Sequence, residues 1–115
     1  MEIIRKETVQ SWLEKHTSTE LYLHLETTNG AYTAYRNGTT ASAGVFIRNG
    51  LVTYEIGKIT GAGPYRVGLK IPLGWVYADG VTHFEIDQQN RLLLAGLDEN
   101  GKLAVALQLS DSPFE

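Results

Sequence analysis

The nine residues ELYLHLETT, positions 20–28, decide the fold of this chain. Leu21, Leu23 and Leu25 occupy every second position, and other residue types stand between them. Successive side chains of a β-strand point to opposite faces of a sheet, so this spacing places the three leucines on one face. The stretch is therefore predicted to be a strand with its leucine face toward the core.

The same alternation recurs along the chain. It is regular in PYRVGLKI (64–71) and GKLAVALQLS (101–110) and less regular in VTHFEID (81–87). Such runs predict about eight strands, because short alternating segments are typical of antiparallel sheets. Their ranges are 20–27, 31–36, 43–48, 51–60, 65–71, 74–79, 81–87 and 91–109, the last as a hairpin of two strands.

Turn signals separate these runs. Asn or Asp before Gly tolerates the positive φ angles that tight hairpin turns require. FIRNGLVTY (46–54) and VYADGVTHF (76–84) place apolar runs directly against such a pair, so both are predicted to be tight hairpins. LAGLDENGKLAV (94–105) suits a slightly longer hairpin loop. The pairs are Asn29-Gly30, Asn37-Gly38, Asn49-Gly50, Asp79-Gly80 and Asn100-Gly101.

One helix is predicted near residues 5–16. An apolar stripe with the spacing i, i+3, i+4 and i+7 marks one helical face there, formed by Val9, Trp12, Leu13 and His16. No sustained helical period follows residue 17, so parallel βαβ units are not expected. The sequence predicts a single all-β domain over residues 1–115, an antiparallel β-sandwich of about eight strands in two sheets with one short N-terminal α-helix.

The glycine-rich stretch KITGAGPYRVGLK (58–70) resembles a phosphate-binding loop only superficially. A dinucleotide-binding loop needs its third glycine three residues after the second, followed by a helix. Here Gly61, Gly63 and Gly68 are spaced differently, and an alternating strand follows. The stretch is therefore predicted to connect two strands. Arg66 and Lys70 share one face of the second strand, where they meet either solvent or an anionic group.

The composition narrows the possible functions. The chain has 115 residues, a net charge of −3 and no cysteine. The net charge argues against a nucleic-acid partner, and the lack of cysteine excludes disulfides, thiolate metal sites and cysteine nucleophiles. The residues MEIIRKETVQSW (1–12) lack the apolar core of a signal peptide, and no apolar run approaches the roughly 20 residues of a membrane helix. A cytoplasmic protein with no membrane partner is expected.

The histidines lack the close spacing of a zinc site, and no cofactor is predicted. His24 shares a strand face with Glu26, and His83 shares one with Glu85. Two facing strands could bring these groups together as a metal site or as the general acid–base pair of a hydrolase. The alternative is that they form the polar outer faces of half-buried strands.

Aromatic side chains are concentrated in the predicted strands, and Trp75 and Tyr77 share a face. Aromatic groups on an exposed sheet face suit sugar or protein binding, whereas as cross-strand pairs they would only stabilise the sheet. A candidate site for a sugar-containing metabolite combines them with neighbouring polar groups. It consists of Tyr54, Arg66, Lys70, Trp75, Tyr77 and His83.

The stretch KLAVALQL (102–109) is apolar on both faces. Leucine and valine occupy one face, and Ala104 and Ala106 occupy the other. An antiparallel strand with one face in water normally alternates between apolar and polar residues. The second face is therefore expected to be covered, by the N-terminal helix or by another subunit. Ala104 and Ala106 are candidate interface residues of a homodimer.

Five stretches, taken in order, resemble the YojF family of small Bacillus proteins: VQSWLEKH (9–16), LYLHLETTNGAY (21–32), AGVFIRNG (43–50), GPYRVGLKIPLGWVYADGVTHFE (63–85) and NRLLLAGLDENGKL (90–103). The similarity spans essentially the whole chain. It implies an all-β sandwich of about eight strands and provides no catalytic motif. Members tend to be encoded beside a zinc-dependent deacetylase of the kind used in bacillithiol synthesis. This implies an accessory role, as a subunit, stabiliser or ligand-binding partner in thiol metabolism.

Three functions follow from these observations. The first is a non-enzymatic interaction module, a homo-oligomer that partners a metabolic enzyme. The second is a binding protein for a sugar-containing metabolite. The third is a hydrolase built around His24, His83 and nearby carboxylates.

Overall fold

The structure, a computed structural model, describes residues 1–28 and 44–115. This part of the chain forms one helix and nine strands. Their bounds are β1 Glu2–Ile3, α1 Lys6–Lys15, β2 Leu21–Thr27, β3 Phe46–Val52, β4 Ile56–Gly61, β5 Tyr65–Ile71, β6 Gly74–Val81, β7 His83–Ile86, β8 Leu92–Leu97 and β9 Leu103–Ser110.

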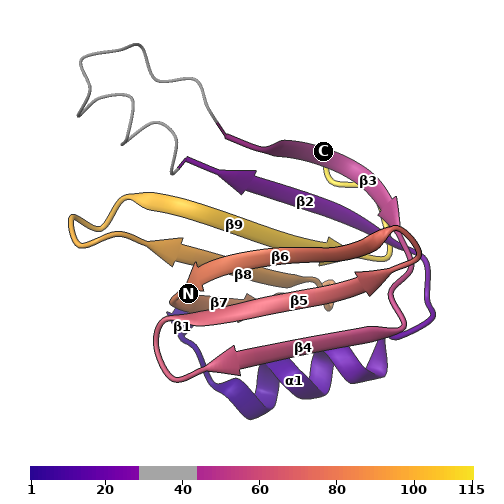
Figure 1. Cartoon of the computed structure of the whole chain (residues 1–115), viewed down its shortest axis with the longest axis horizontal. Helices are drawn as coiled ribbons and strands as arrows, with labels where there is room; N and C mark the ends of the chain where they lie inside the picture. Colours follow the sequence, from indigo (N-terminus) through magenta and orange to yellow (C-terminus); the bar gives the residue numbers. More distant parts are fainter. Residues whose placement is uncertain (29–43) are drawn as a thin grey trace.

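The strands form two antiparallel sheets that face each other (Figure 1). The large sheet has the strand order β1-β7-β8-β9-β2-β3, and the small sheet has the order β4-β5-β6. Every pairing among the described strands is antiparallel. The predicted all-β fold with two antiparallel sheets and one short helix is confirmed.

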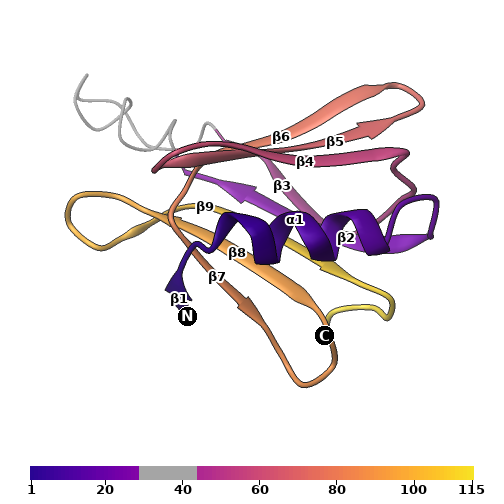
Figure 2. The same ribbon diagram turned by 90° about the horizontal axis from the view of Figure 1, so that it is seen from below.

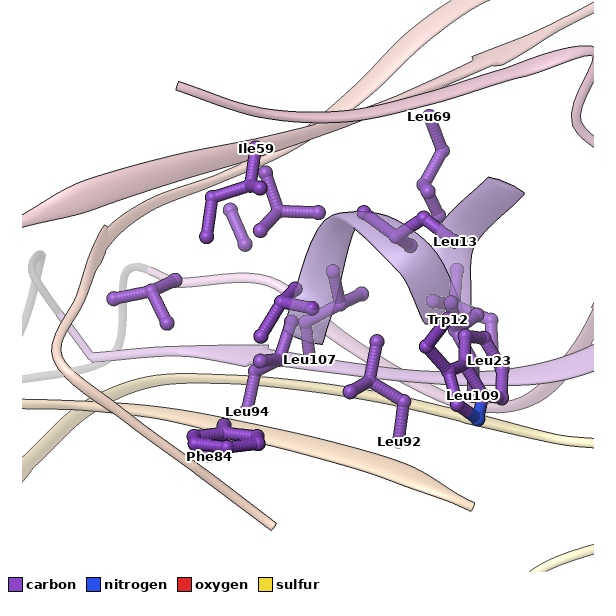
Figure 3. Packing of buried hydrophobic residues seen from close by; sticks show 14 of the residues in the cluster. Trp12, Leu13, Leu23, Ile59, Leu69, Phe84, Leu92, Leu94, Leu107 and Leu109 are labelled. Atoms are coloured by element: carbon purple, nitrogen blue, oxygen red, sulfur yellow. The ribbon is translucent and has the colours of Figure 1, made fainter. Parts of the chain in front are cut away.

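The core lies between the two sheets. The large sheet contributes Leu23, Leu94 and Leu107, and the small sheet contributes Ile59 and Leu69 (Figure 3). Each of these side chains is at most 3% exposed. Burying one such side chain contributes roughly 1.5–3 kcal/mol to the free energy of unfolding. The alternating leucines therefore hold the sheets together and leave the intervening residues on the two outer faces.

Helix α1 closes one open side between the sheets, beside β4 (Figure 2). Its predicted apolar stripe is confirmed, because Val9, Trp12 and Leu13 are buried in the same core. The indole Nε1 of Trp12 donates a hydrogen bond to the carbonyl oxygen of Asn90, 3.1 Å away in the β7–β8 turn. The helix is thus attached to both layers. In the described part of the chain, no helix is long and apolar enough to cross a membrane.

A helix side chain also covers the edge of β4. Gln10 Nε2 donates to the carbonyl oxygen of Gly57 at 3.0 Å, and Gln10 Oε1 accepts a hydrogen bond from the amide of Ile59 at 2.9 Å. The side-chain amide takes the place of a neighbouring strand, because it satisfies one donor and one acceptor on the same edge. Such capping blocks pairing of an exposed edge with another chain.

Both predicted tight hairpins are wrong. Asn49 and Gly50 lie inside β3, which pairs continuously with β2 apart from a register shift between Leu23 and Leu25. The positive φ of Asn49, +58°, serves an irregularity of the strand and not a chain reversal. The predicted strand 51–60 is consequently divided between β3 and β4.

The pair Asp79-Gly80 behaves in the same way. It lies within β6, and the chain then passes to β7 in the other sheet, so β6 and β7 do not pair. Gly80 has a φ of +83°, and its carbonyl oxygen lies so close to Gly96 that a Cβ atom at Gly96 would stand 2.3 Å from it. The Asx-Gly signal therefore marks a change of sheet here.

Other connections agree with the sequence. Asn100-Gly101 lies in the β8–β9 hairpin, where Asp98 Oδ1 accepts hydrogen bonds from the amides of Asn100 and Lys102. The stretch around Gly61 and Gly63 connects β4 to β5, as predicted. The short strand β1, which pairs with β7, was not expected from the sequence. The predicted strand 31–36 and the first two Asx-Gly pairs lie outside the described residues.

Candidate functional site

The outer face of the small sheet carries an exposed aromatic pair. Trp75 and Tyr77 of β6 lie with ring centroids 5.6 Å apart and planes within 5° of parallel. Their side chains are 43% and 49% exposed. Together with Arg66 and Lys70 of β5, they form a set that we call the aromatic surface. The prediction that Trp75 and Tyr77 share a face is confirmed by the alternating burial along β6.

Gly68 is the reason that the two rings can lie against the sheet. It stands directly opposite Tyr77 in the β5–β6 register. A Cβ atom at this position would stand 2.8 Å from Tyr77 Cε1 and 3.2 Å from Trp75 Cε3. A glycine on a neighbouring strand is often covered by an aromatic ring in this manner. The rings cover the backbone and leave their other side open to solvent.

Charged pairs stand at both ends of the aromatic surface. Arg66 donates to Asp79 at 2.9 Å, and its guanidinium carbon lies 5.2 Å from the centre of the Tyr77 ring. Lys70 Nζ lies 3.0 Å from a carboxylate oxygen of Glu55. The hydrogen bond from Arg66 lowers the pKa of the Asp79 carboxyl, and the same bond raises the pKa of Arg66. The surface therefore presents two cations, two carboxylates and two open rings.

The structure places the other two candidate residues elsewhere. Tyr54 lies in the connection from β3 to β4 and is fully buried. Its hydroxyl donates to the carbonyl oxygen of Leu13 at 2.7 Å. Burial raises the pKa of this hydroxyl above its ordinary value. His83 lies in β7 of the large sheet, with Nδ1 2.7 Å from the Thr82 hydroxyl. Four of the six candidates thus share one surface.

The outer face of the large sheet has small apolar residues at its centre. The register sets Ala95 of β8 opposite Ala106 of β9, and Ala106 opposite Glu26 of β2. Ala95 and Ala106 are 6% and 5% exposed, and Ala104 is half-buried. We call these three residues the alanine face. Helix α1 packs on the core side of the sheet and so does not cover it.

The histidines of the hydrolase hypothesis lie on different strands. His24 Nε2 is 3.3 Å from Glu26 Oε1, and His24 Nδ1 is 3.2 Å from an Arg48 guanidinium nitrogen. His83 is on β7, separated from β2 by β8 and β9. Three strand spacings separate His83 from Glu26, and His24 lies two residues further along β2, so the two histidines are at least about 14 Å apart. Among the described residues, no three His, Asp or Glu side chains are grouped as metal ligands.

The C-terminal residues after β9 return to the outer face of the large sheet. Phe114 is 7% exposed, and its backbone amide and carbonyl both bond to the side chain of Asn49, at 2.7 and 2.8 Å. The guanidinium carbons of Arg48 and Arg91 lie 5.2 and 5.6 Å from the centre of the Phe114 ring. The segment is therefore held by its backbone and by its one large side chain.

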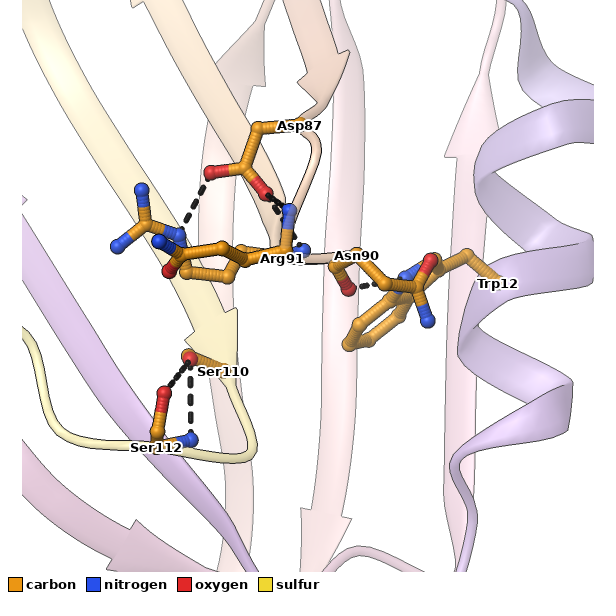
Figure 4. A network of polar contacts seen from close by, with 7 residues as sticks. Trp12, Asp87, Asn90, Arg91, Ser110 and Ser112 are labelled. Atoms are coloured by element: carbon orange, nitrogen blue, oxygen red, sulfur yellow. Dashed lines mark hydrogen bonds and ion pairs between the residues drawn. The ribbon is translucent and has the colours of Figure 1, made fainter.

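A polar cleft of about 810 Å³ lies beside this segment. Figure 4 shows the polar contacts on its rim, including those of Asp87 with Arg91 and of Ser110 with Ser112. We call it the tail cleft. It is lined by Arg48, Gln89, Arg91, Leu93, Gln108, Ser112, Pro113, Phe114 and Glu115.

The sequence analysis did not select any residue of the tail cleft. One signal was available, because Phe114 is a bulky apolar side chain within the otherwise small, polar or acidic stretch DSPFE (111–115). Such a residue is normally buried against something. The positions of Arg48 and Arg91 could not be found in this way, because β9 and β2 separate β8 from β3 and the two side chains meet only at the Phe114 ring.

The geometry defines a small all-β, two-sheet domain with an aromatic surface on one outer face and an alanine face on the other. A family model described as a protein of unknown function (DUF1806) matches residues 3–114. The chain is 50% identical over 114 residues to the uncharacterized protein YojF of Bacillus subtilis (strain 168), covering 99% of this chain and 98% of that protein. The crystal structure of Bacillus subtilis YojF is similar, with a TM-score of 0.82 and 48% identity over 99% of this chain and 96% of the other. The chain therefore belongs to the DUF1806 family, which confirms the resemblance noted in the sequence.

Proposed function

We propose that this protein is a non-enzymatic interaction module that forms a homodimer through the alanine face. One observation carries the proposal. The central strands β8 and β9 are apolar on both faces, with Leu94 and Leu107 in the core and Ala95 and Ala106 outside. The sequence analysis expected a cover from the helix or from another subunit. Helix α1 packs on the core side and does not cover this face, while Ala95 and Ala106 are only 6% and 5% exposed within one chain, so a second subunit would contact mainly the larger side chains around them.

The residues beside the alanines favour a second copy of the chain. His83 of β7 is opposite Ala95, and Glu26 of β2 is opposite Ala106, so a polar group stands on each side of the two alanines. The row continues to Ile3 of β1 and Phe46 of β3. A two-fold axis between β8 and β9, parallel to the strands, would place His83 of each copy against Glu26 of the other. Small side chains between them would let the two sheets approach to about 10 Å.

Sedimentation velocity over a range of protein concentrations tests the proposal. The expected species has twice the 12.7 kDa mass of one chain. Ala106→Glu should give a monomer whose far-UV circular dichroism matches that of the wild type, because a charge would be buried in the interface without a partner; a variant that unfolds instead would show that Ala106 is covered within one chain. Thr60→Glu, an exposed position on the small sheet, is the matched control and should remain a dimer. A wild-type chain that stays monomeric at all concentrations would contradict the proposal.

The family resemblance also motivates an enzyme partner. We propose that the module acts beside a zinc-dependent deacetylase of thiol metabolism, in the cytoplasm, where the cysteine-free sequence is compatible with reducing conditions. Mixing the two purified proteins and measuring the mass of the product by light scattering tests this directly. A complex larger than either protein supports it, and two unchanged masses contradict it without affecting the homodimer proposal.

A second function, binding of a sugar-containing metabolite, rests on a separate observation. Trp75 and Tyr77 present two nearly parallel open rings, with Arg66 and Lys70 at the ends. Sugar rings stack on such surfaces, and the flanking cations can hold hydroxyl or anionic groups. Two of the residues predicted for this site, Tyr54 and His83, lie outside the surface and have no part in the proposal.

The two tryptophans allow a specific test of sugar binding. Trp12 donates its indole hydrogen within the molecule, whereas Trp75 is exposed. In a ¹H–¹⁵N correlation spectrum, a glycoside bound to the aromatic surface should shift the indole signal of Trp75 and leave that of Trp12 in place. In a thermal-shift assay, Trp75→Ala should abolish the stabilisation that the glycoside is expected to give the wild-type protein. Shifts at neither indole with millimolar glycosides would contradict this function.

A further inference from the structure

We propose that the tail cleft binds a small molecule that carries a carboxylate or phosphate group, with Arg91 holding its oxygens and Arg48 adding a second positive charge. The cleft measures about 810 Å³, which is within the usual range for small-molecule sites. Its residues come from β3, the β7–β8 turn, β8, β9 and the C-terminal segment. The cleft is on the sheet opposite the aromatic surface, and it shares the outer face of the large sheet with the alanine face, since Leu93 and Gln108 lie two residues from Ala95 and Ala106.

Arg91 is positioned for such a ligand by Asp87. The carboxylate of Asp87 accepts hydrogen bonds from the Gln89 amide at 3.0 Å, the Arg91 amide at 3.0 Å and Arg91 Nε at 2.6 Å. Desolvation raises the pKa of Asp87, but the hydrogen bonds from Arg91 and Gln89 outweigh it and leave the pKa below its ordinary value. Asp87 therefore stays ionised and fixes the guanidinium plane.

The terminal nitrogens of Arg91 are directed away from Asp87 (Figure 4). No described residue accepts a hydrogen bond from them. A guanidinium held through Nε presents these two nitrogens as a planar fork, which matches the two oxygens of a carboxylate or phosphate. The side chain is 28% exposed, so a ligand in the cleft can reach it.

Arg48 supplies the second cation. One of its terminal nitrogens faces His24 Nδ1, and the other donates to the carbonyl oxygen of Glu115. Phe114 lies against both arginines, so the same ring sets the positions of the two guanidinium groups. Because Asn49 holds the Phe114 backbone on both sides, the arrangement is formed before any ligand binds.

The other residues that line the cleft favour an anion because they supply hydrogen-bond donors. Gln89, Gln108 and Ser112 add side-chain N–H and O–H groups to the two guanidinium groups. Asp87 and Glu115 offset part of the positive charge. Selectivity is therefore expected to depend on the placement of the donors and less on the net charge of the cleft.

Isothermal titration with inorganic phosphate and, separately, with succinate tests the proposal and distinguishes the two anion types. Saturable binding of at least one is expected. Arg91→Gln should weaken it by about tenfold or more, because charge-assisted hydrogen bonds to the ligand are lost, and Arg48→Gln should weaken it less, because it removes only a nearby positive charge. Arg5→Gln is the matched control, because Arg5 also pairs with a carboxylate, that of Glu2, but lies outside the cleft and the aromatic surface. It should leave the affinity unchanged.

Arg91→Gln could lose its fold together with its bond to Asp87, so Arg91→Lys and Gln89→Ala are measured as well. Arg91→Lys keeps the charge but removes the fork, and should still weaken binding severalfold. The titration is repeated over a range of protein concentrations, which shows whether dimer formation on the same face changes the affinity. Absence of saturable binding, or equal affinity in the wild type and all cleft variants, would overturn the proposal.

Discussion

The two outer faces of the molecule hold their aromatic side chains in opposite ways. On the small sheet, Trp75 and Tyr77 are 43% and 49% exposed and rest on a glycine. On the large sheet, Phe114 is 7% exposed, lies against two arginines and has both backbone groups bonded to Asn49. Trp75 and Tyr77 thus present their rings to solvent, whereas the ring of Phe114 attaches a chain segment; Phe46 of the large sheet is also exposed, at 69%.

This difference separates a binding role from a structural role. The rings on the small sheet can be removed without opening the core, because the core residues of β5 point to the other side. Phe114 fixes the chain end and both arginines of the tail cleft, so its loss should alter stability and site together. Mutations at matched positions on the two faces can therefore test the distinction.

The largest effect is expected for Phe114→Ala. Loss of a buried phenyl ring should lower the free energy of unfolding by about 3 kcal/mol. Denaturant unfolding measures this value, and Phe114→Leu, which keeps most of the apolar contact, should lose less than half as much. A change below about 0.5 kcal/mol for Phe114→Ala would show that the segment is not attached in solution.

Asn49 should have the next largest effect. Asn49→Ala loses two hydrogen bonds to Phe114 and places alanine at a φ of +58°, a region unfavourable for residues with a Cβ atom. We expect a loss of about 2 kcal/mol. Asn49→Gly removes the same bonds without the backbone strain and should lose about 1 kcal/mol. Equal losses of unfolding free energy in the two variants would contradict a contribution from backbone strain at position 49.

Much of the fold could be predicted from the periodic spacing of the apolar residues. The leucines of β2 and β9 and the stripe of α1 mark their buried sides directly, because one face of each element has to leave water. Asn49-Gly50 and Asp79-Gly80 misled the prediction for a physical reason. A positive φ angle is needed equally for a tight turn, an irregular strand and a change of sheet. The local sequence does not distinguish these uses.

The candidate site was predictable only in part. Arg66, Lys70, Trp75 and Tyr77 lie on two paired strands, so their alternation was enough to bring them together. His83 could not be placed, because only the strand order assigns it to the large sheet. Tyr54 could not be placed either, because the alternation does not show that it is buried in the core. The tail cleft depends on contacts between segments more than 60 residues apart in the chain, such as that of Asn49 with Phe114 at a separation of 65.

The two arginine–aspartate pairs give a third test. Arg91 and Asp87 are 28% and 14% exposed, whereas Arg66 and Asp79 are 52% and 66% exposed. Double-mutant cycles should give a coupling energy of about 1–2 kcal/mol for the first pair. The second pair should show almost none, since exposed ion pairs are screened by solvent. Equal coupling in both pairs would remove the distinction between the faces.

The pH dependence follows from the same pair. The pKa of Asp87 is lower in the folded chain than its unfolded value near 3.9, so its contribution to stability is complete above that pH. The contribution is lost as the pH falls through the folded pKa. The stability difference between wild type and Asp87→Asn should therefore shrink on acidification below about pH 4. A stability difference between the two proteins that stays constant down to pH 2 would contradict a stabilising role of the ionised Asp87 carboxylate.

The smallest change in stability is expected for Trp75→Ala. The indole is larger than the ring of Phe114, but it lies on the outer face, is 43% exposed and packs mainly against its neighbour Tyr77 and Gly68. Such a pair contributes up to about 1 kcal/mol to a sheet, so the loss should not exceed that value. Denaturant unfolding beside Phe114→Ala makes the comparison direct. A loss as large as that of Phe114→Ala would mean that Trp75 supports the fold, and the aromatic surface would then have to be regarded as structural.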